Sequence, residues 1–344
     1  MPDYRFTVVH TDAGPDDDLS TETAMFDAIG ARLIRAGGPG EDVLIEAVRN
    51  ADALIVVRSY ITPRVAAAMQ QCQVVTRTGV GFDTLDIPAL TENGVIAVNL
   101  PDIWTDEVAN QALALLLTLN RRVLQYDRLV RDGRWRNFSQ PHIGPLTGET
   151  MGIVGYGRIG STFARRCTAL GMRVLAYDPY RSGPLDDQTG AELVRDLDAL
   201  LSQSDYISLH CPLSDETHHM IGEAQLRRMR PHAFLLNTAR GLVVDEQALV
   251  KALQEGWIAG AGIDAFEQEP PPRDNPLLGF DNVVLSPHNG FYSDASVARM
   301  HRRVAEEIIA VLNGGWPDNP VNPDVAGHPK HAHRKTHAHA KAGD

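Results

Sequence analysis

The sequence predicts an α/β protein with two domains, each built on a doubly wound parallel sheet. Its 344 residues are too many for one ordinary hydrophobic core and suit two. Short apolar runs alternate with amphipathic stretches in two separate series, over residues 4–99 and from residue 151 onward. A glycine-rich string from Gly155 to Gly160 follows the first strand of the second series, as in sheets that bind dinucleotides.

The first series predicts a small α/β unit. Four apolar runs, residues 6–9, 53–57, 73–75 and 95–98, have the length and composition of buried parallel strands. Helices are expected between them, at 41–50, 63–71 and 84–93. A long helix should then run from Thr105, a favourable N-cap, to about Arg131, because leucines keep a helical period until Gly133.

The second series predicts a six-stranded sheet of the Rossmann type. A further helix is expected over residues 293–313, ended by Gly314. From residue 326 to 344 the chain is polar and rich in histidine, and we expect a disordered tail without a physiological metal site. The six expected strands are 151–154, 173–177, 206–209, 233–236, 260–263 and 283–285.

Composition and charge exclude several classes of protein. The net charge of −12 is opposite to the clustered positive charge of proteins that bind nucleic acid directly. The longest apolar run, residues 112–119, is less than half of the ~20 residues that a membrane span needs. The N-terminus has no signal-peptide pattern, and three widely spaced cysteines predict reduced thiols in a cytoplasm, with neither a disulfide framework nor a zinc site.

The string Gly155–Gly160 predicts a dinucleotide site. Gly155 permits the tight turn, Gly157 lets the backbone approach a pyrophosphate, and Gly160 allows helix and strand to pack closely. Eighteen residues further, Asp178 ends the next strand, where an acid binds the ribose 2′-hydroxyl and repels a 2′-phosphate. This favours NAD over NADP, although Arg181 could serve NADP. The alternative is a glycine turn that binds no ligand.

Three strings after later strands carry the residue types that a hydride-transfer reaction needs. They are residues 237–241, 262–270 and 286–290, which contain an arginine, acids and a histidine respectively. A histidine can exchange a proton with a substrate oxygen, a carboxylate can orient it, and an arginine can clamp a substrate carboxylate with two hydrogen bonds. Each residue type alone is more often structural. Because ligands bind at the carboxyl ends of parallel strands, their joint occurrence predicts an active site.

These strings, with Gly79-Val80-Gly81-Phe82-Asp83 and Pro287-His288, resemble the D-isomer-specific 2-hydroxyacid dehydrogenase family over about residues 50–320. The resemblance implies that Arg240, Glu269 and His288 carry catalysis. It also implies that the backbone at Val80 and Gly81 holds the substrate carboxylate, beside Arg240 and His288. Apart from the resemblance, Arg58 could meet a second anionic group of the substrate. The residues that it implies for NAD are Thr105, Gly155, Tyr156, Gly157, Arg158, Ile159, Gly160, Asp178, Pro179, His210, Cys211, Pro212, Thr217, Thr238, Ala239, Arg240, Asp264, His288 and Gly290.

The resemblance also implies how the domains are organised. A Rossmann-type NAD-binding domain, residues 101–290, should be inserted in a smaller flavodoxin-like substrate domain, residues 1–100 and 291–325, in a homodimer. Within the family, the sequence most resembles the branch of the C-terminal-binding proteins, in segments such as residues 177–180 and 288–293. The expected function is the NAD-dependent interconversion of a 2-keto acid and a D-2-hydroxy acid. The alternative is a co-repressor-like protein that binds NAD(H) and turns over weakly or not at all.

Overall fold

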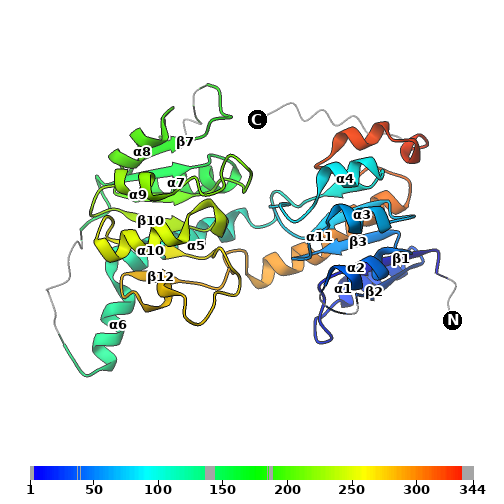
Figure 1. Ribbon diagram of the computed structural model, residues 1–344, viewed down its shortest axis with the longest axis horizontal. Coiled ribbons are helices and arrows are strands. Elements are labelled where there is room, and N and C mark those ends of the chain that lie inside the picture. Colours follow the sequence, from blue (N-terminus) through cyan, green and yellow to red (C-terminus); the bar gives the residue numbers. More distant parts are fainter. Residues whose placement is uncertain are drawn as a thin grey trace. The chain divides into compact units, whose positions relative to one another are not determined.

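The computed structural model describes residues 4–36, 38, 40–135, 144–183, 185 and 189–334. The chain forms two compact units (Figure 1). The terminal unit comprises Met1–Trp104 and Ser293–Asp344, and the central unit comprises Thr105–Tyr292. The sequence placed these borders at 100/101 and 290/291.

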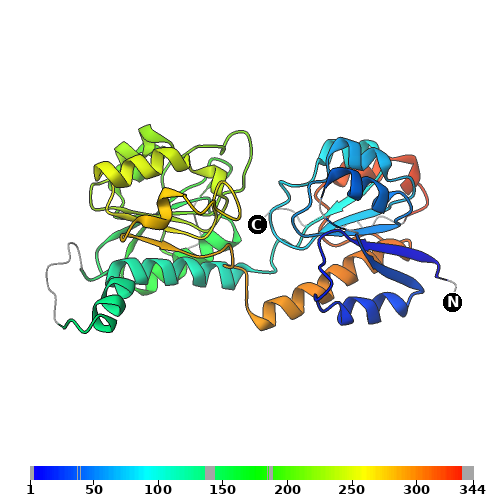
Figure 2. The same ribbon diagram turned by 60° about the horizontal axis from the view of Figure 1, so that its bottom comes forward.

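The terminal unit has a parallel five-stranded sheet in the order β2-β1-β3-β4-β5. This is the doubly wound order 2-1-3-4-5 of flavodoxin-like sheets. Helices α1 and α11 cover one face, and α2, α3 and α4 lie on the other (Figure 2). Its elements are β1 (Phe6–His10), α1 (Ser20–Asp27), β2 (Ala31–Arg35), α2 (Glu41–Val48), β3 (Ala53–Val56), α3 (Pro63–Ala68), β4 (Val74–Arg77), α4 (Ile87–Glu92), β5 (Ile96–Val98), α11 (Asp294–Leu312) and the 3-10 turns Pro323–Gly327 and Pro329–His331.

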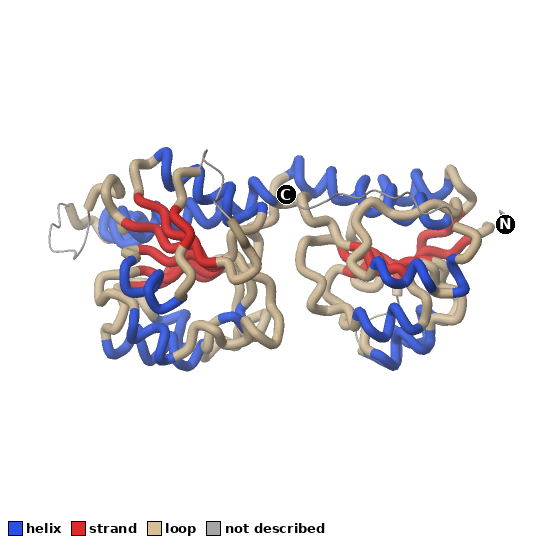
Figure 3. The backbone as a smooth tube through the Cα atoms, turned by 90° about the horizontal axis from the view of Figure 1, so that it is seen from above, coloured by secondary structure: helices blue, strands red, loops and turns tan. Residues whose placement is uncertain are grey.

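The central unit has a parallel seven-stranded sheet in the order β12-β11-β10-β9-β6-β7-β8. Helices α5 and α7 pack against one face of the sheet, and α8, α9 and α10 pack against the other (Figure 3). An apolar core therefore lies on each face, between the sheet and the helices that cover it. Its elements are α5 (Thr105–Arg121), α6 (Val123–Arg131), β6 (Thr150–Val154), α7 (Arg158–Ala169), β7 (Arg173–Tyr177), β8 (Glu192–Leu193), α8 (Leu197–Gln203), β9 (Tyr206–Leu209), α9 (Glu223–Arg228), β10 (Phe234–Asn237), α10 (Glu246–Glu255), β11 (Gly260–Ile263), β12 (Val283–Leu285) and the 3-10 turns Gly241–Val243 and Pro276–Gly279.

The expected six-stranded sheet lacked the short edge strand β8, which adds a seventh strand. Two further expectations were wrong. The single helix from Thr105 to Arg131 is broken at Arg122, which has a left-handed backbone (φ 52°) and a buried side chain whose guanidinium lies 5.2 Å from the centre of the Phe234 ring. A left-handed residue ends an α-helix, so α5 and α6 are separate.

The second correction concerns the expected disordered tail. Residues 326–334 fold against the terminal unit, where the buried guanidinium of Arg334 donates to the carbonyl of Gly315 at 2.9 Å and to Nδ1 of His331. Nε2 of His331 lies 2.9 Å from the carbonyl oxygen of Gly94. The sequence reading treated this segment as polar low complexity and missed its buried hydrogen bonds. Residues 335–344 lie outside the described residues.

Candidate active site

The loops at the carboxyl edge of the central sheet collect the predicted cofactor and catalytic residues. They follow β12, β11, β10, β9, β6 and β7, six strands that lie next to one another in the sheet in that order. Chain order reverses between β6 and β9, and open α/β sheets bind ligands at such a switch point.

The three glycines of the loop after β6 differ in whether protein packing requires a residue without a side chain. A Cβ on Gly155 (φ +90°) would lie 2.6 Å from the backbone nitrogen of Cys211, and one on Gly160 would lie 2.2 Å from the carbonyl oxygen of Gly155. Packing alone therefore requires both. A Cβ on Gly157 would meet nothing within 4 Å, so protein packing does not require this glycine.

The open space at Gly157 fits a pyrophosphate. Gly157 is the N-cap of α7 and has no side chain to cap it, so Arg158, Ile159 and Gly160 begin the helix with backbone N–H groups that can bind an anion. Gly157 and Arg158 are exposed, whereas Tyr156 is buried and anchors the loop through its hydroxyl, 2.6 Å from Oγ1 of Thr189.

Asp178 lies beside the same loop. Its carboxylate accepts hydrogen bonds from the backbone N–H groups of Tyr156 at 2.9 Å and Tyr180 at 3.0 Å. The acid is thereby fixed next to the phosphate loop, where the family's ribose contact is expected. Pro179 follows it on the surface, and the Arg181 guanidinium lies 5.8 Å from the centre of the Tyr156 ring.

The loop after β9 begins with two uncharged side chains, His210 and Cys211. Burial lowers the pKa of His210 to about 3, so its ring is neutral, and it lies 2.9 Å from Oγ of Ser208. Burial likewise raises the pKa of Cys211 to about 11, which keeps the thiol protonated. Thr217 donates to the carbonyl of Pro212 at 2.7 Å and so closes the loop on itself.

A buried hydroxyl in the loop after β10 is available to a ligand. Within the described part of the chain, Oγ1 of Thr238 is buried without a hydrogen-bond partner. Buried polar atoms are usually paired, and an exception calls for an explanation. A cofactor contact supplies one. The neighbouring Ala239 N–H is satisfied by Oδ1 of Asn237 at 3.0 Å.

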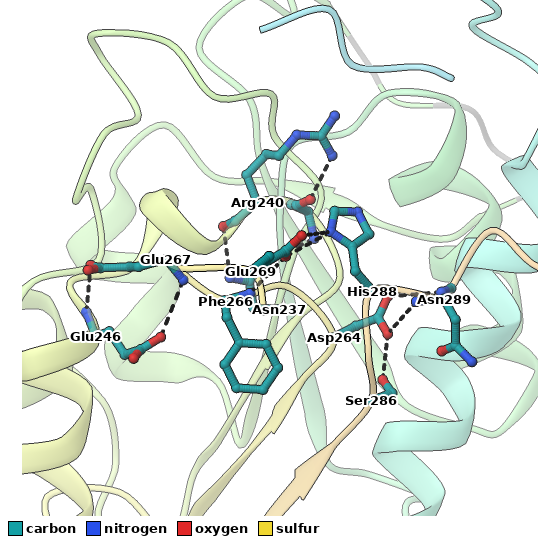
Figure 4. A network of polar contacts seen from close by, with 12 residues as sticks. Asn237, Arg240, Glu246, Asp264, Phe266, Glu267, Glu269, Ser286, His288 and Asn289 are labelled. Atoms are coloured by element: carbon teal, nitrogen blue, oxygen red, sulfur yellow. Dashed lines mark hydrogen bonds and ion pairs between the residues drawn. The ribbon is translucent and has the colours of Figure 1, made fainter. Parts of the chain in front are cut away.

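His288 and Glu269 form a close pair (Figure 4). Nδ1 of His288 lies 2.8 Å from each carboxylate oxygen of Glu269, and the Phe266 N–H donates to one of these oxygens at 3.1 Å. Burial raises the pKa of Glu269, but the hydrogen bond and charge of His288, the Phe266 N–H and the charge of Arg240 outweigh it, and the net pKa is lowered. The carboxylate is thus held ionised against the ring.

Arg240 stands at the same edge as the pair, with an extended backbone (φ −139°, ψ 143°) after β10 (Figure 4). Its carbonyl accepts from Nδ2 of Asn237 at 2.9 Å. The next residue, Gly241, packs so tightly that a Cβ there would lie 1.9 Å from the carbonyl carbon of Phe266. The arginine loop and the loop that carries Glu269 are therefore locked together at this edge of the sheet.

Asp264 and Gly290 have protein contacts that the sequence did not reveal. Asp264 is 2% exposed, and its carboxylate accepts from the N–H groups of Asn289 at 3.1 Å and Gly290 at 3.0 Å. It clamps the turn in which His288 has a left-handed backbone (φ 51°), a conformation that costs about 1–3 kcal/mol outside glycine. Hydrogen bonds to a charged group, at about 1.5–3 kcal/mol each, are sufficient to offset it. A direct cofactor contact of Asp264 or Gly290 stays a prediction.

The predicted substrate residues Arg58, Val80 and Gly81 lie at the carboxyl edge of the sheet in the terminal unit, after β3 and β4. The Val80 carbonyl accepts from Nδ2 of Asn99 at 2.6 Å. Arg58 is exposed. Thr105, predicted to contact the cofactor, begins α5 of the central unit.

Sequence reasoning missed Asp12, which shapes the loop around Arg58. Its carboxylate accepts from the Val57 N–H at 2.8 Å and from the Ser59 hydroxyl at 3.0 Å. An acid directly after the first strand was the available signal. Gln111 and Ser286 were missed as well, and their side chains are hydrogen-bonded to each other at 2.9 Å.

The comparisons with known proteins agree with this geometry. Residues 113–290 match the family model of the D-isomer specific 2-hydroxyacid dehydrogenase NAD-binding domain. The chain is 46% identical to a glyoxylate reductase of Korarchaeum cryptofilum over 83% of this chain and 87% of the relative, and 42% identical to one of Thermococcus litoralis over 83% and 88%. A structure of D-lactate dehydrogenase from Aquifex aeolicus with NAD and lactic acid superposes with a TM-score of 0.82 at 29% identity, over 92% of this chain and 99% of the other.

The chain belongs to the D-isomer-specific 2-hydroxyacid dehydrogenase family. It is an NAD-dependent oxidoreductase that interconverts a 2-keto acid and a D-2-hydroxy acid. The alternative of a co-repressor-like sensor is not favoured, since the relatives are enzymes at this level of identity. Membership of the C-terminal-binding-protein branch of this family stays a prediction.

None of the described helices is long and apolar enough to cross a membrane. In the described ranges, no three histidine, cysteine, aspartate or glutamate side chains gather as metal ligands.

Proposed function

We propose that the protein reduces a small 2-keto acid of the glyoxylate class, with His288 as acid–base, Glu269 as its partner and Arg240 as the clamp for the substrate carboxylate. The pair of 2.8 Å contacts between Nδ1 of His288 and the Glu269 carboxylate carries this proposal. The choice of substrate class is supported by the glyoxylate reductases at 42–46% identity.

The two nitrogens of the His288 ring have different roles in this proposal. Because Nδ1 is bound to Glu269, Nε2 is the atom that can exchange a proton with the substrate oxygen. During reduction the protonated ring gives this proton to the oxygen on C2 as that carbon accepts a hydride. During oxidation the neutral ring takes the proton back. The ionised Glu269 keeps the ring oriented and stabilises its charged form.

The planar guanidinium of Arg240 matches the two oxygens of a substrate carboxylate and also attracts the negative charge that develops on the carbonyl oxygen. When bound, NADH supplies the hydride. The residues suited to hold it are the backbone of Gly157–Gly160, Asp178 and the unpaired hydroxyl of Thr238. In the terminal unit, the backbone N–H groups at Val80 and Gly81 are proposed to bind the substrate carboxylate, and Arg58 to meet a second anionic group.

We also propose a homodimer through α5 and α6. Four apolar side chains on these helices are 37–52% exposed, namely Leu117, Val123, Leu124 and Val130. Apolar surface gathered on adjoining helices is typical of an interface. Sedimentation analysis should give twice the chain mass of 37.6 kDa, and Val123→Glu with Val130→Glu should reduce it to one.

A cytoplasmic location is proposed on the state of the cysteines. All three are free, and burial raises the pKa of Cys72 and of Cys167 to about 12. Unpaired thiols suit a reducing compartment. Fractionation of the cells that produce the protein tests this directly.

A panel of 2-keto acids assayed with NADH tests the proposed function. Glyoxylate should be reduced with the highest kcat/KM, ahead of pyruvate and hydroxypyruvate. Preference for another acid would overturn the glyoxylate class and leave the roles of the three residues intact. Tight NADH binding without turnover of any member would overturn the enzymatic proposal.

A further inference from the structure

A chain of side chains connects α5 to the turn that carries His288. Nε2 of Gln111, on α5, donates to Oγ of Ser286 at 2.9 Å. Ser286 follows β12 and donates in turn to Oδ1 of Asp264 at 2.5 Å. The second half of this chain is visible in Figure 4, where Ser286, Asp264 and Asn289 lie below the imidazole of His288.

Asp264 is joined to the turn that carries His288 by three hydrogen bonds. Its backbone carbonyl accepts from the His288 N–H at 2.8 Å. Its carboxylate oxygens accept separately from the N–H groups of Asn289 and Gly290. Because Oδ1 is shared by Ser286 and Asn289, a rotation of the carboxylate would loosen the hydrogen bonds that hold His288 at φ 51°. The hydroxyl of Ser286 opposes that rotation.

Gln111 also touches the turn directly. A Cβ on Gly290 would lie 3.3 Å from Cγ of Gln111 and 2.8 Å from Oδ2 of Asp264. The methylene groups of Gln111 thus lie against one end of the turn while its amide fixes Ser286 at the other. A helix packed on the sheet is a rigid support, and second-layer hydrogen bonds are what hold a catalytic side chain within a fraction of an ångström.

We propose that Gln111 and Ser286 are positioning residues that act through Asp264 to set the orientation of the His288 ring. This inference rests on the proposed role of His288. Neither residue needs to touch substrate or cofactor for this role. The expected signature is a loss of the chemical rate without a loss of cofactor affinity.

Gln111→Met and Ser286→Ala test the proposal, since they remove the hydrogen-bonding groups and keep most of the side-chain volume. We expect kcat for NADH-dependent reduction of glyoxylate to fall roughly 10-fold in each, because small misplacements of a reacting group have large effects on rate. The dissociation constant of NADH, measured by fluorescence, should stay within about 2-fold. Ser286→Thr retains the hydroxyl and should restore most of the rate.

The double variant separates one pathway from two independent effects. If both residues act through the same carboxylate, Gln111→Met with Ser286→Ala should lower kcat little more than Ser286→Ala alone. Independent effects would multiply to about 100-fold, which would overturn the proposed chain.

Matched controls exist on α8. Gln203→Met and Ser202→Ala repeat the two substitutions at exposed positions whose side chains bond only to carbonyls of their own helix. Both should leave kcat unchanged. If Gln111→Met and Ser286→Ala merely lower the melting temperature and keep kcat, the positioning role is wrong and the residues are structural. That outcome would leave the proposed function standing, whereas full activity in His288→Ala would remove it.

Discussion

Glu269 meets Nδ1 of His288 with both of its carboxylate oxygens at 2.8 Å, so the ring is oriented by a carboxylate and not by a neutral acceptor. The pair sits at the carboxyl end of the central sheet, and Arg240 lies beside it (Figure 4).

Glu269→Gln should lower the reduction rate roughly 10²-fold near neutral pH, because an amide cannot stabilise the charged ring. The pKa of Glu269 is lowered in the folded protein, so the carboxylate contribution is present above the ordinary value of about 4.5 and is lost as pH falls through the lowered one. The difference in rate between wild type and variant should therefore diminish as pH falls through that acid range, where the wild-type carboxylate also becomes protonated. A difference that does not change with pH would contradict the ionised-carboxylate role.

Arg240→Lys should reduce kcat/KM for the keto acid by roughly 10²-fold, because an ammonium cannot form the two parallel hydrogen bonds of a guanidinium. The binding of NADH should change little. Arg228→Lys, at an exposed surface ion pair, is the matched control and should behave like wild type. An Arg240→Lys enzyme with normal KM and kcat would show that this residue does not bind the substrate carboxylate.

Asp178 should make NADH preferred over NADPH, since its carboxylate can bind the ribose hydroxyls and repels a 2′-phosphate. Asp178→Ala should reduce the ratio of kcat/KM with NADH to kcat/KM with NADPH by about 10-fold or more. The change should come chiefly from weaker binding of NADH. The variant also loses the hydrogen bond from the Tyr156 N–H. Equal use of NADPH by the wild-type enzyme would instead point to Arg181.

A buried ion pair in the terminal unit predicts a pH-dependent stability. Nδ1 of His301 is hydrogen-bonded to Glu22, which is 1% exposed. The hydrogen bond to Glu22 is the largest influence that raises the pKa of His301, followed on the raising side by the charges of Glu22, Asp18 and Asp17. The stabilisation is fully present below the unfolded value of about 6.5 and is lost as pH rises through the raised pKa.

His301→Gln should therefore lower the melting temperature more at about pH 6 than at about pH 9. We expect the difference to be about 2–4 °C, which corresponds to about 1 kcal/mol for a unit of this size. His218→Gln, at an exposed position of the central unit, serves as the control. An equal loss at both pH values would mean that the pair contributes no charge-dependent stability.

Features set by local pattern could be predicted from the sequence. The glycine loop, Asp178 at the end of the next strand and the residues that follow β10, β11 and β12 each depend on nearby residue types and on the rule that parallel strands end at one edge. The strand β2 and the helix α1 were missed. β2 contains Arg32 and Arg35 and is only partly buried at the edge of its sheet, so it lacks a continuous apolar run.

Features set by contacts between distant residues could not be predicted in this way. Gln111 and Ser286 are 175 positions apart, and the burial of Arg334 depends on carbonyls and on Gln73, 261 positions away. The helix breaks at Arg122 because this residue has a left-handed backbone, a conformation usually found at glycine. The Arg122 guanidinium lies over the ring of Phe234, which is far away in the sequence. Judged from the residues next to it in the sequence, each of these polar side chains would be expected on the solvated surface.

Acid–base catalysis by His288 is tested by the rate of hydride transfer in His288→Ala. Enzyme saturated with NADH is mixed rapidly with glyoxylate, and the loss of NADH absorbance is followed over a single turnover, while NADH affinity is measured separately. We expect a rate roughly 10²–10⁴-fold below that of wild type, with a dissociation constant for NADH that is unchanged within about 2-fold. A rate close to that of wild type, with the same pH profile, would contradict it.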